Sequence, residues 1–301
     1  MKRSLLVLAW AASCVPALAV YGINTGPDSE DTTFQWVGRV GNNGSGTVIA
    51  PNWVLTASHV RGNQFTLNGT TYTAAEVYDH PTSDLWLMRF NHTFGGFYPI
   101  FTGPLLSYEV HLVGYGNSAT YRSDHLGYNP LPQSDPRSFG IRRSATNRIE
   151  ASGTASFDFG GATGVRTFAA IAYDLDYHSE MTPVGPYRRD IYGLGGATSN
   201  EGGVLAGDSG GAWLVDVGGG DFRLIGVSSL IGTSGGTDAP PVPAGGNGAA
   251  TFGLGVGIAV DLTAASNSDW IVQTVPEPGS LIALGLGAAA LAYRRRRRSS
   301  R

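Results

Sequence analysis

Apolar residues along this chain occur in short runs that turn residues interrupt. Residues 34–40 are rich in β-forming side chains and lead directly into a turn-type sequence at residues 41–44. Residues 46–56 hold two further apolar runs that meet at a Pro-Asn corner, and residues 85–90 and 223–230 repeat the pattern. Runs of this length predict many short strands rather than long helices.

The composition supports a mostly β fold. Only 14% of the residues are charged and 44 are glycines, whereas long helices favour Ala, Leu, Glu and Lys. A chain of 301 residues is long enough to bury a substantial core. We therefore expect one compact body made of two β layers or two barrels.

The N-terminal residues 1–19 have the pattern of a secretory signal that signal peptidase removes. Lys2 and Arg3 are followed by an apolar centre at residues 5–12 and by the small-residue sequence Ala-Leu-Ala. The apolar run is well short of the roughly 20 residues of a membrane span. Cys14 is the only cysteine and lies in this segment, so we expect the mature body to have no disulfides.

The charges are unevenly distributed. Eight of the 20 basic residues and one of the 23 acidic residues lie in segments 1–19 and 276–301. The body between them therefore carries 12 basic and 22 acidic residues, a net charge of −10. This balance argues against nucleic-acid binding through a basic patch.

The segment Gly207-Asp208-Ser209-Gly210-Gly211 is the strongest candidate for chemistry. A serine nucleophile needs a neighbouring base and hydrogen-bond donors for the oxyanion that forms. Glycines on both sides of Ser209 permit positive φ and a close approach of substrate to the amides of Gly207 and Ser209. A plain surface turn is the alternative interpretation, because small and acidic residues are common in turns.

His59 is the candidate general base. It ends the sequence Trp-Val-Leu-Thr-Ala-Ser-His, which places it directly after an apolar strand. Asp84, at the start of the apolar run 85–90, is the candidate that orients the imidazole. Asp79 is the competitor, but Pro81 follows it closely and interrupts the strand that would have to position it. An aspartate that only caps a turn before a strand is the alternative for Asp84.

These motifs resemble those of the trypsin-like, chymotrypsin-fold (S1-type) serine proteases. The resemblance spans residues 34–272 in order and is strongest at His59 and Ser209. It implies an all-β fold of two six-stranded antiparallel β-barrels, with the active site in the cleft between them and a short closing helix near residues 268–271. The peptidase domain would cover residues 20–275, with a first barrel at about 34–116, closed by the run 111–117, and a second at about 138–272.

The resemblance also implies the residues that bind substrate. Ser209 would be the nucleophile, His59 the general base and Asp84 its partner, with the amides of Gly207 and Ser209 forming the oxyanion hole. The specificity pocket would be lined by residues from three segments: Gly203, Ser229, Ile231 and Gly255. Gly203 is not acidic, so a preference for Lys or Arg side chains is not expected unless Glu201 reaches the pocket.

The new N-terminus after cleavage would be Val20. It loosely resembles the activated start of family members, whose freed amine pairs with the aspartate before the nucleophile, here Asp208. A buried ammonium group requires such a counter-charge. A loose polar tail is the alternative for this segment. Asp174 and Asp176 are expected to face solvent on a strand rather than to bind calcium.

The C-terminal residues 276–301 resemble the PEP-CTERM sorting tail of Gram-negative bacteria with exosortase-type systems. A Val-Pro-Glu-Pro-Gly sequence precedes an apolar run at 281–292 and five arginines at 294–298. The arginines would stop the inserted segment on the cytoplasmic side. An ordinary membrane anchor is the alternative, although the apolar run is short for a full span.

The sequence thus predicts a secreted or cell-surface serine endopeptidase that acts on polypeptides and needs no metal or organic cofactor. The expected partners are signal peptidase and an exosortase-type sorting enzyme, with only transient contact to the membrane. The alternative function is a catalytically idle protease-fold protein that binds at the cell surface or in its matrix.

Overall fold

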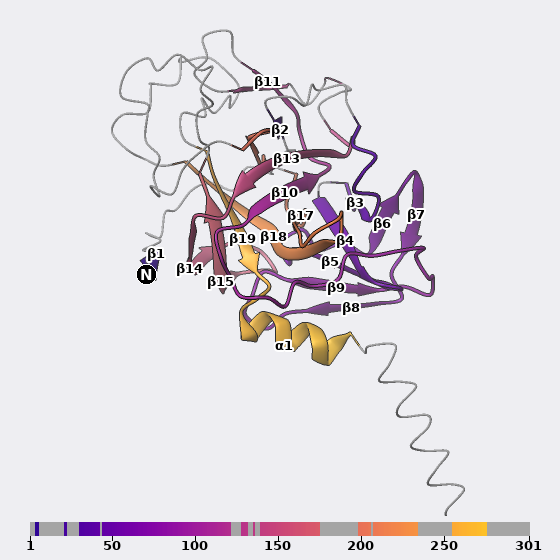
Figure 1. Ribbon diagram of the computed structural model, residues 1–301. Helices are drawn as coiled ribbons and strands as arrows, with labels where there is room; N and C mark the ends of the chain where they lie inside the picture. Colours follow the sequence, from indigo (N-terminus) through magenta and orange to yellow (C-terminus); the bar gives the residue numbers. More distant parts are fainter. Residues whose placement is uncertain are drawn as a thin grey trace, which may run out of the picture.

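A computed structural model describes the body of the chain and two short N-terminal pieces (Figure 1). The described residues are 4–5, 21–22, 30–42, 44–121, 128–131, 135, 139–174, 198–205, 207–233 and 255–275. Within them the chain forms two large sheets, antiparallel except for one short parallel pair at an edge, and one helix. The expected all-β class with a short C-terminal helix is therefore confirmed.

The first sheet has seven strands in the order β7-β6-β3-β4-β5-β9-β8. Its bounds are β3 Val37–Val40, β4 Gly44–Ala50, β5 Trp53–Thr56, β6 Gln64–Leu67, β7 Thr70–Thr73, β8 Glu76–Asp79 and β9 Trp86–Arg89. Residues 41 and 42 form a turn directly after β3, within the predicted turn, and the Pro-Asn corner connects β4 to β5.

The second sheet has eight strands in the order β1-β14-β15-β19-β18-β17-β10-β13. Its bounds are β1 Ser4–Leu5, β10 Glu109–Gly114, β13 Arg143–Arg148, β14 Ala151–Asp158, β15 Val165–Tyr173, β17 Ala212–Asp216, β18 Phe222–Thr233 and β19 Gly255–Asp261. Two small ladders join β11 Ala119–Tyr121 to β12 Tyr128–Pro130, and β2 Tyr21–Gly22 to β16 Gly202–Gly203.

The strand counts differ from the expected six per barrel. In the second sheet one extra strand is β1, which pairs with β14, and the other results from a two-residue corner between β13 and β14. Ile149 donates its N–H to the carbonyl of Tyr108, and Glu150 donates to Ala172, at 2.8 and 3.0 Å. Through this corner one bent stretch of chain changes partner, so that β13 pairs with β10 and β14 with β15.

The strand expected to close the first barrel lies elsewhere. β10 contains residues 109–114 and pairs with β13 and β17, both in the second sheet. The chain crosses over earlier, where Phe101 donates to the carbonyl of Leu224 and Leu224 to that of Pro99. The expected boundary near residue 116 was therefore wrong for this strand.

Strand residues alternate between two cores, which explains why the sequence runs are continuously apolar. On β5, Val54 packs into a core within the first sheet, whereas Trp53 and Leu55 pack into the core that both sheets share. On the second sheet, Leu214 joins the shared core and Trp213 joins a separate core behind it. The shared core fixes the two sheets against each other.

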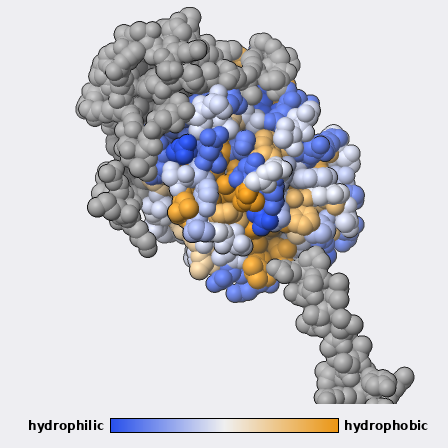
Figure 2. Space-filling model, in the orientation of Figure 1, coloured by the Kyte–Doolittle hydropathy of each residue, from blue (hydrophilic) through white to orange (hydrophobic). Residues whose placement is uncertain are grey.

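Helix α1 Ala265–Thr274 closes the fold beneath the sheets (Figure 1). Asn267 and Ile271 are its buried residues, and Asn267 donates to the carbonyl of Asp261 at 2.7 Å. On the face seen in Figure 2, hydrophobic and hydrophilic residues are interleaved across the described body. In the part of the chain described here, no helix is long and apolar enough to cross a membrane.

His80 connects α1 to the loop that follows β8. Its Nδ1 accepts hydrogen bonds from the amides of Thr82 and Ser83, and its Nε2 donates to the carbonyl of Ser266. Its ring also lies edge-on to Trp270, with centroids 4.8 Å apart. Because Nδ1 acts as an acceptor, this arrangement requires the neutral imidazole, and burial lowers the pKa of His80.

We predict that the stability of the protein depends on His80 in mildly acidic solution. In the unfolded chain His80 binds a proton below about pH 6.5, whereas in the folded protein it does so only at lower pH. Stability from this group is therefore fully present above pH 6.5 and is lost as the pH falls. Denaturant unfolding between pH 8 and 5 should show that the free energy of unfolding falls less for His80→Gln than for the wild type. An equal dependence of this free energy on pH in the two proteins would contradict the prediction. Burial also lowers the pKa of His111, but this residue is present in both proteins and so does not affect the comparison.

Candidate active site

Strand pairing in the first sheet brings His59 and Asp84 to one edge. β5 and β9 are antiparallel neighbours, and Thr56 at the end of β5 pairs with Trp86 at the start of β9. The residues that follow β5 and those that precede β9 must therefore lie side by side. His59 lies in a turn in which Val60 donates to the carbonyl of Ala57 at 3.1 Å.

His59, Asp84 and Ser209 form one hydrogen-bonded line. His59 Nδ1 is 2.7 Å from Asp84 Oδ2, and His59 Nε2 is 2.7 Å from Ser209 Oγ. A carboxylate at Nδ1 selects the tautomer with the proton on Nδ1, which leaves the Nε2 lone pair facing the serine hydroxyl. The structure thus joins the three residues that the sequence singled out separately.

The Asp84 carboxylate has no solvent exposure and is held by three donors. Besides the imidazole, its Oδ1 accepts the backbone N–H of His59 at 2.9 Å and its Oδ2 accepts Ser229 Oγ at 2.6 Å. A buried carboxylate is tolerated when such donors replace water. The donors come from both sheets, because Ser229 lies on β18.

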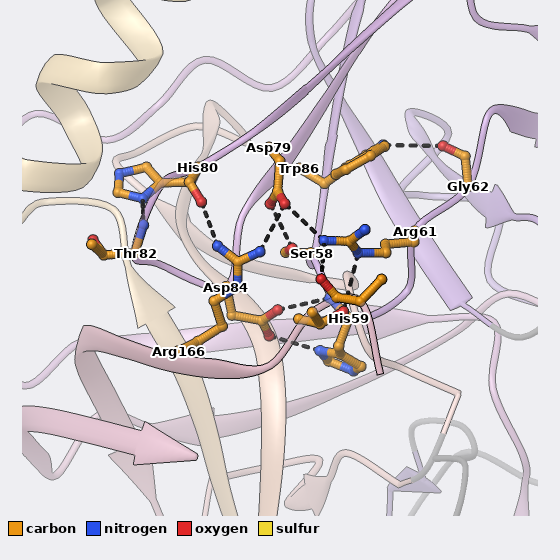
Figure 3. A network of polar contacts seen from close by, with 12 residues as sticks. Ser58, His59, Arg61, Gly62, Asp79, His80, Thr82, Asp84, Trp86 and Arg166 are labelled. Atoms are coloured by element: carbon orange, nitrogen blue, oxygen red, sulfur yellow. Dashed lines mark hydrogen bonds and ion pairs between the residues drawn. The ribbon is translucent and has the colours of Figure 1, made fainter. Parts of the chain in front are cut away.

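The rival candidate Asp79 has other partners. Its carboxylate accepts hydrogen bonds from Ser58 Oγ at 2.6 Å, Arg61 at 2.9 Å and Arg166 at 2.7 Å (Figure 3). In the same view Asp84 points to the backbone and ring of His59. The geometry therefore favours Asp84 over Asp79 as the partner of the imidazole.

The Ser209 loop depends on glycine. Gly207 and Gly210 have φ values of +105° and +83°, in the region that L side chains rarely adopt. A Cβ on Gly210 would also collide with the carbonyl oxygen of Ser45 and with Thr56 Oγ1. The loop conformation thus requires the residue types that the sequence supplies.

Ser45 on β4 attaches the Ser209 loop to the first sheet. Its backbone N–H donates to the carbonyl of Ser209 at 2.8 Å, and its Oγ donates to the carbonyl of Gly207 at 3.2 Å. The same Oγ accepts the N–H of Tyr115 at 3.0 Å, and Thr56 Oγ1 donates to the Ser45 carbonyl at 2.6 Å. Ser45 was missed in the sequence, because its two bonds to the Ser209 loop join residues more than 150 positions apart.

One of the two expected oxyanion donors has a defined orientation. The carbonyl of Asp208 accepts the N–H of Gly211 at 2.6 Å. Because a trans peptide directs its C=O and N–H to opposite sides, the N–H of Ser209 points away from Gly211. The amide of Gly207 shares its peptide with Ala206, which lies outside the described residues.

The side chain of Asp208 is fully buried behind the loop. It accepts the amides of Leu205 at 3.0 Å and Gly116 at 3.3 Å. The proposed pairing with Val20 falls outside the described residues. The next two residues of the chain form β2, which pairs with β16 shortly before the Ser209 loop.

The expected pocket residues lie in different surroundings. Gly203 is buried on β16, and Gly255 begins β19 opposite Thr233. Ile231 is partly buried and packs against the core within the second sheet. Ser229 contacts Asp84, a role not foreseen from its expected place in the pocket wall.

The carboxylate of Glu201, the other candidate for the pocket, already has hydrogen-bond partners. This buried residue accepts hydrogen bonds from Asn147 Nδ2 at 2.7 Å and from the amide and hydroxyl of Thr198 at 2.8 and 2.7 Å. The expectation that Asp174 faces solvent was wrong, since it is 1% exposed, and Asp176 lies outside the described residues. Among the described residues, no group of three or more His, Cys, Asp or Glu side chains is arranged to hold a metal ion.

Comparison with solved structures finds serine proteases. The active form of the Rv3671c protease from M. tuberculosis has 14% sequence identity and a TM-score of 0.47, over 89% of this chain and 93% of that chain. Its inactive form has 15% identity and a TM-score of 0.45, over 80% and 89%. Neuropsin, a serine protease expressed in the limbic system of mouse brain, has 14% identity and a TM-score of 0.45, over 84% and 98%.

The sequence was also compared with curated proteins and with protein-family models. No curated protein matches this chain. Residues 274–298 match the PEP-CTERM protein-sorting motif, within two residues of the predicted start of the tail. The C-terminus of this chain therefore carries a PEP-CTERM sorting motif, which indicates export and sorting to the cell surface in Gram-negative bacteria.

Proposed function

We propose that this protein is an exported serine endopeptidase that cleaves polypeptides through an acyl-enzyme intermediate. The observation that carries the proposal is the continuous hydrogen-bonded line from Ser229 through Asp84 and His59 to Ser209. Nucleophile, base and orienting carboxylate are all within hydrogen-bonding distance, as this chemistry requires.

In the first half of the reaction, Ser209 Oγ attacks the carbonyl carbon of the peptide while His59 Nε2 takes its proton. The negative charge on the carbonyl oxygen is stabilised by the N–H groups of Gly207 and Ser209. Asp84 stabilises the imidazolium and keeps it oriented. The C–N bond then breaks as His59 gives the proton to the leaving amine, and Ser209 remains acylated.

In the second half, water attacks the ester carbonyl and His59 takes a proton from it. Collapse of the second tetrahedral intermediate breaks the bond to Ser209 Oγ, which recovers its proton from His59. No metal or organic cofactor takes part in these steps. Gly203 and the engaged carboxylate of Glu201 argue against a preference for Lys or Arg side chains.

The two ends of the chain fit an exported enzyme. Residues 1–19 would direct export and be removed by signal peptidase, so that the peptidase domain of residues 20–275 acts outside the cytoplasm. An exosortase-type enzyme would then recognise the PEP-CTERM motif and process the tail.

We expect an active-site fluorophosphonate to label the wild-type protein at Ser209 and to leave Ser209→Ala unlabelled. The wild type should also cleave casein, and the variant should have no activity above background. Equal melting temperatures of the two proteins would show that the loss is chemical. Labelling that persists in Ser209→Ala would refute the nucleophile, and a folded wild type that neither reacts nor cleaves would favour the idle surface protein.

We expect Asp84→Asn to lower kcat by roughly 10³–10⁴-fold, because an amide at this position favours the wrong imidazole tautomer. Asp216→Asn provides the matched control, since Asp216 is exposed and accepts the amides of Gly218 and Gly220 in a surface turn. Steady-state kinetics on one peptide substrate should show wild-type kcat for the control. A wild-type kcat in Asp84→Asn would contradict the role of Asp84.

A further inference from the structure

An aromatic side chain of the second sheet covers the candidate base of the first. Phe159 directly follows β14 and stacks on His59, with ring centroids 4.5 Å apart and planes 4° from parallel. Phe157 supports it from the side, edge-on at 4.9 Å. The stack covers one face of the imidazole, and the His59 side chain is 20% exposed in all.

The turn that carries Phe159 is tight. Phe159 donates to the carbonyl of Gly164 at 3.1 Å, and Gly164 donates to that of Gly160 at 3.0 Å. Gly160, Gly161 and Gly164 all have positive φ, between +53° and +68°. The glycines let β14 reverse into β15 within a few residues, so the position of Phe159 follows that of the hairpin as a whole.

Arg61, two residues after His59, binds the tip of this hairpin. Its guanidinium donates to the carbonyl of Ala162 at 2.8 Å and to Thr163 Oγ1 at 3.1 Å. The Arg61 backbone has a φ of +40°, which costs energy for a residue with a side chain. Its guanidinium also lies 5.5 Å from the ring centre of Trp86.

The part of β15 next to the turn is attached to the segment before Asp84. Arg166 on β15 donates to the carbonyl of His80 at 2.5 Å, and the amide of Thr167 donates to the carbonyl of Thr82 at 3.0 Å. The hairpin therefore contacts both loops that carry the candidate base and its carboxylate.

Asp79 links these attachments. One carboxylate accepts Ser58 and Arg61, which flank His59, and also Arg166 from the hairpin (Figure 3). The Arg166 side chain is 7% exposed, whereas Arg61 and Asp79 are about one third exposed. We call Arg61, Asp79 and Arg166 the hairpin clamp.

We propose that Phe159 is a positioning residue for His59, and that the hairpin clamp holds Phe159 in place. Two hydrogen bonds in the ring plane orient the imidazole, but they act only while the ring keeps its side-chain rotamer. A flat ring stacked on one face blocks rotation to that side and excludes water from it. The inference rests on the proposed function, because the positioned group is the proposed base.

The test compares Phe159→Leu, which keeps an apolar side chain, with Phe159→Tyr, which keeps the flat ring. Phe159→Leu should lower kcat roughly 10-fold with little change in KM, as expected when a reacting group is misplaced. Phe159→Tyr should retain a kcat near that of the wild type. Val165→Ala is the matched control, since Val165 lies on the same hairpin and is 64% exposed.

A double-mutant cycle tests the clamp. Arg61→Met should lower kcat in the same way, and the double variant Arg61→Met/Phe159→Leu should be no slower than the slower single variant, because both act through one hairpin. Additive losses would overturn the link between clamp and stack. An unchanged kcat in Phe159→Leu would overturn the role of Phe159.

Histidine NMR separates this inference from the proposed function. The ring protons of His59, assigned with His59→Gln, should shift downfield in Phe159→Leu because the ring current of Phe159 is lost. They should not shift in Val165→Ala. A wild type that fails to react with fluorophosphonate refutes the proposed function, whereas unshifted His59 signals in Phe159→Leu refute the stack even if the enzyme is active.

Discussion

The buried carboxylate of Asp84 is the constraint on which the site depends. A carboxylate without solvent exposure must replace its water with donors, and here the donors are the amide and ring of His59 and the hydroxyl of Ser229. Two of them come from the first sheet and one from the second. The complete set of donors around Asp84 therefore exists only when the two sheets are packed together.

The shared core supplies that packing. Leu55 and Leu87 flank the His59 and Asp84 loops and lie in the same core as Leu214 and Val227 of the second sheet. Ser45, which lies on the first sheet, adds a polar connection, since it donates hydrogen bonds to the carbonyls of Ser209 and Gly207. Apolar burial thus sets the distance between the sheets, and a few directional bonds set the position of the nucleophile loop.

Local signals accounted for much of the fold and for the three central residues. Short apolar runs with turn residues between them predicted the strands correctly, because strand formation and turns follow local preferences. His59, Asp84 and the Ser209 loop were found because each sits at a strand end next to a distinctive sequence. The strand counts, the sheet that contains β10, and the exposure of Asp174 were not predicted, because each depends on which distant segment becomes a neighbour.

The sequence by itself determined the strand pattern, the glycine positions of the nucleophile loop, and the sorting motif at residues 274–298. All of these are properties of neighbouring residues. Only the tertiary structure decided that Ser229 binds Asp84 and that Phe159 stacks on the imidazole. The physical reason is that these contacts join residues 145 and 100 positions apart, and no local preference encodes such a pairing.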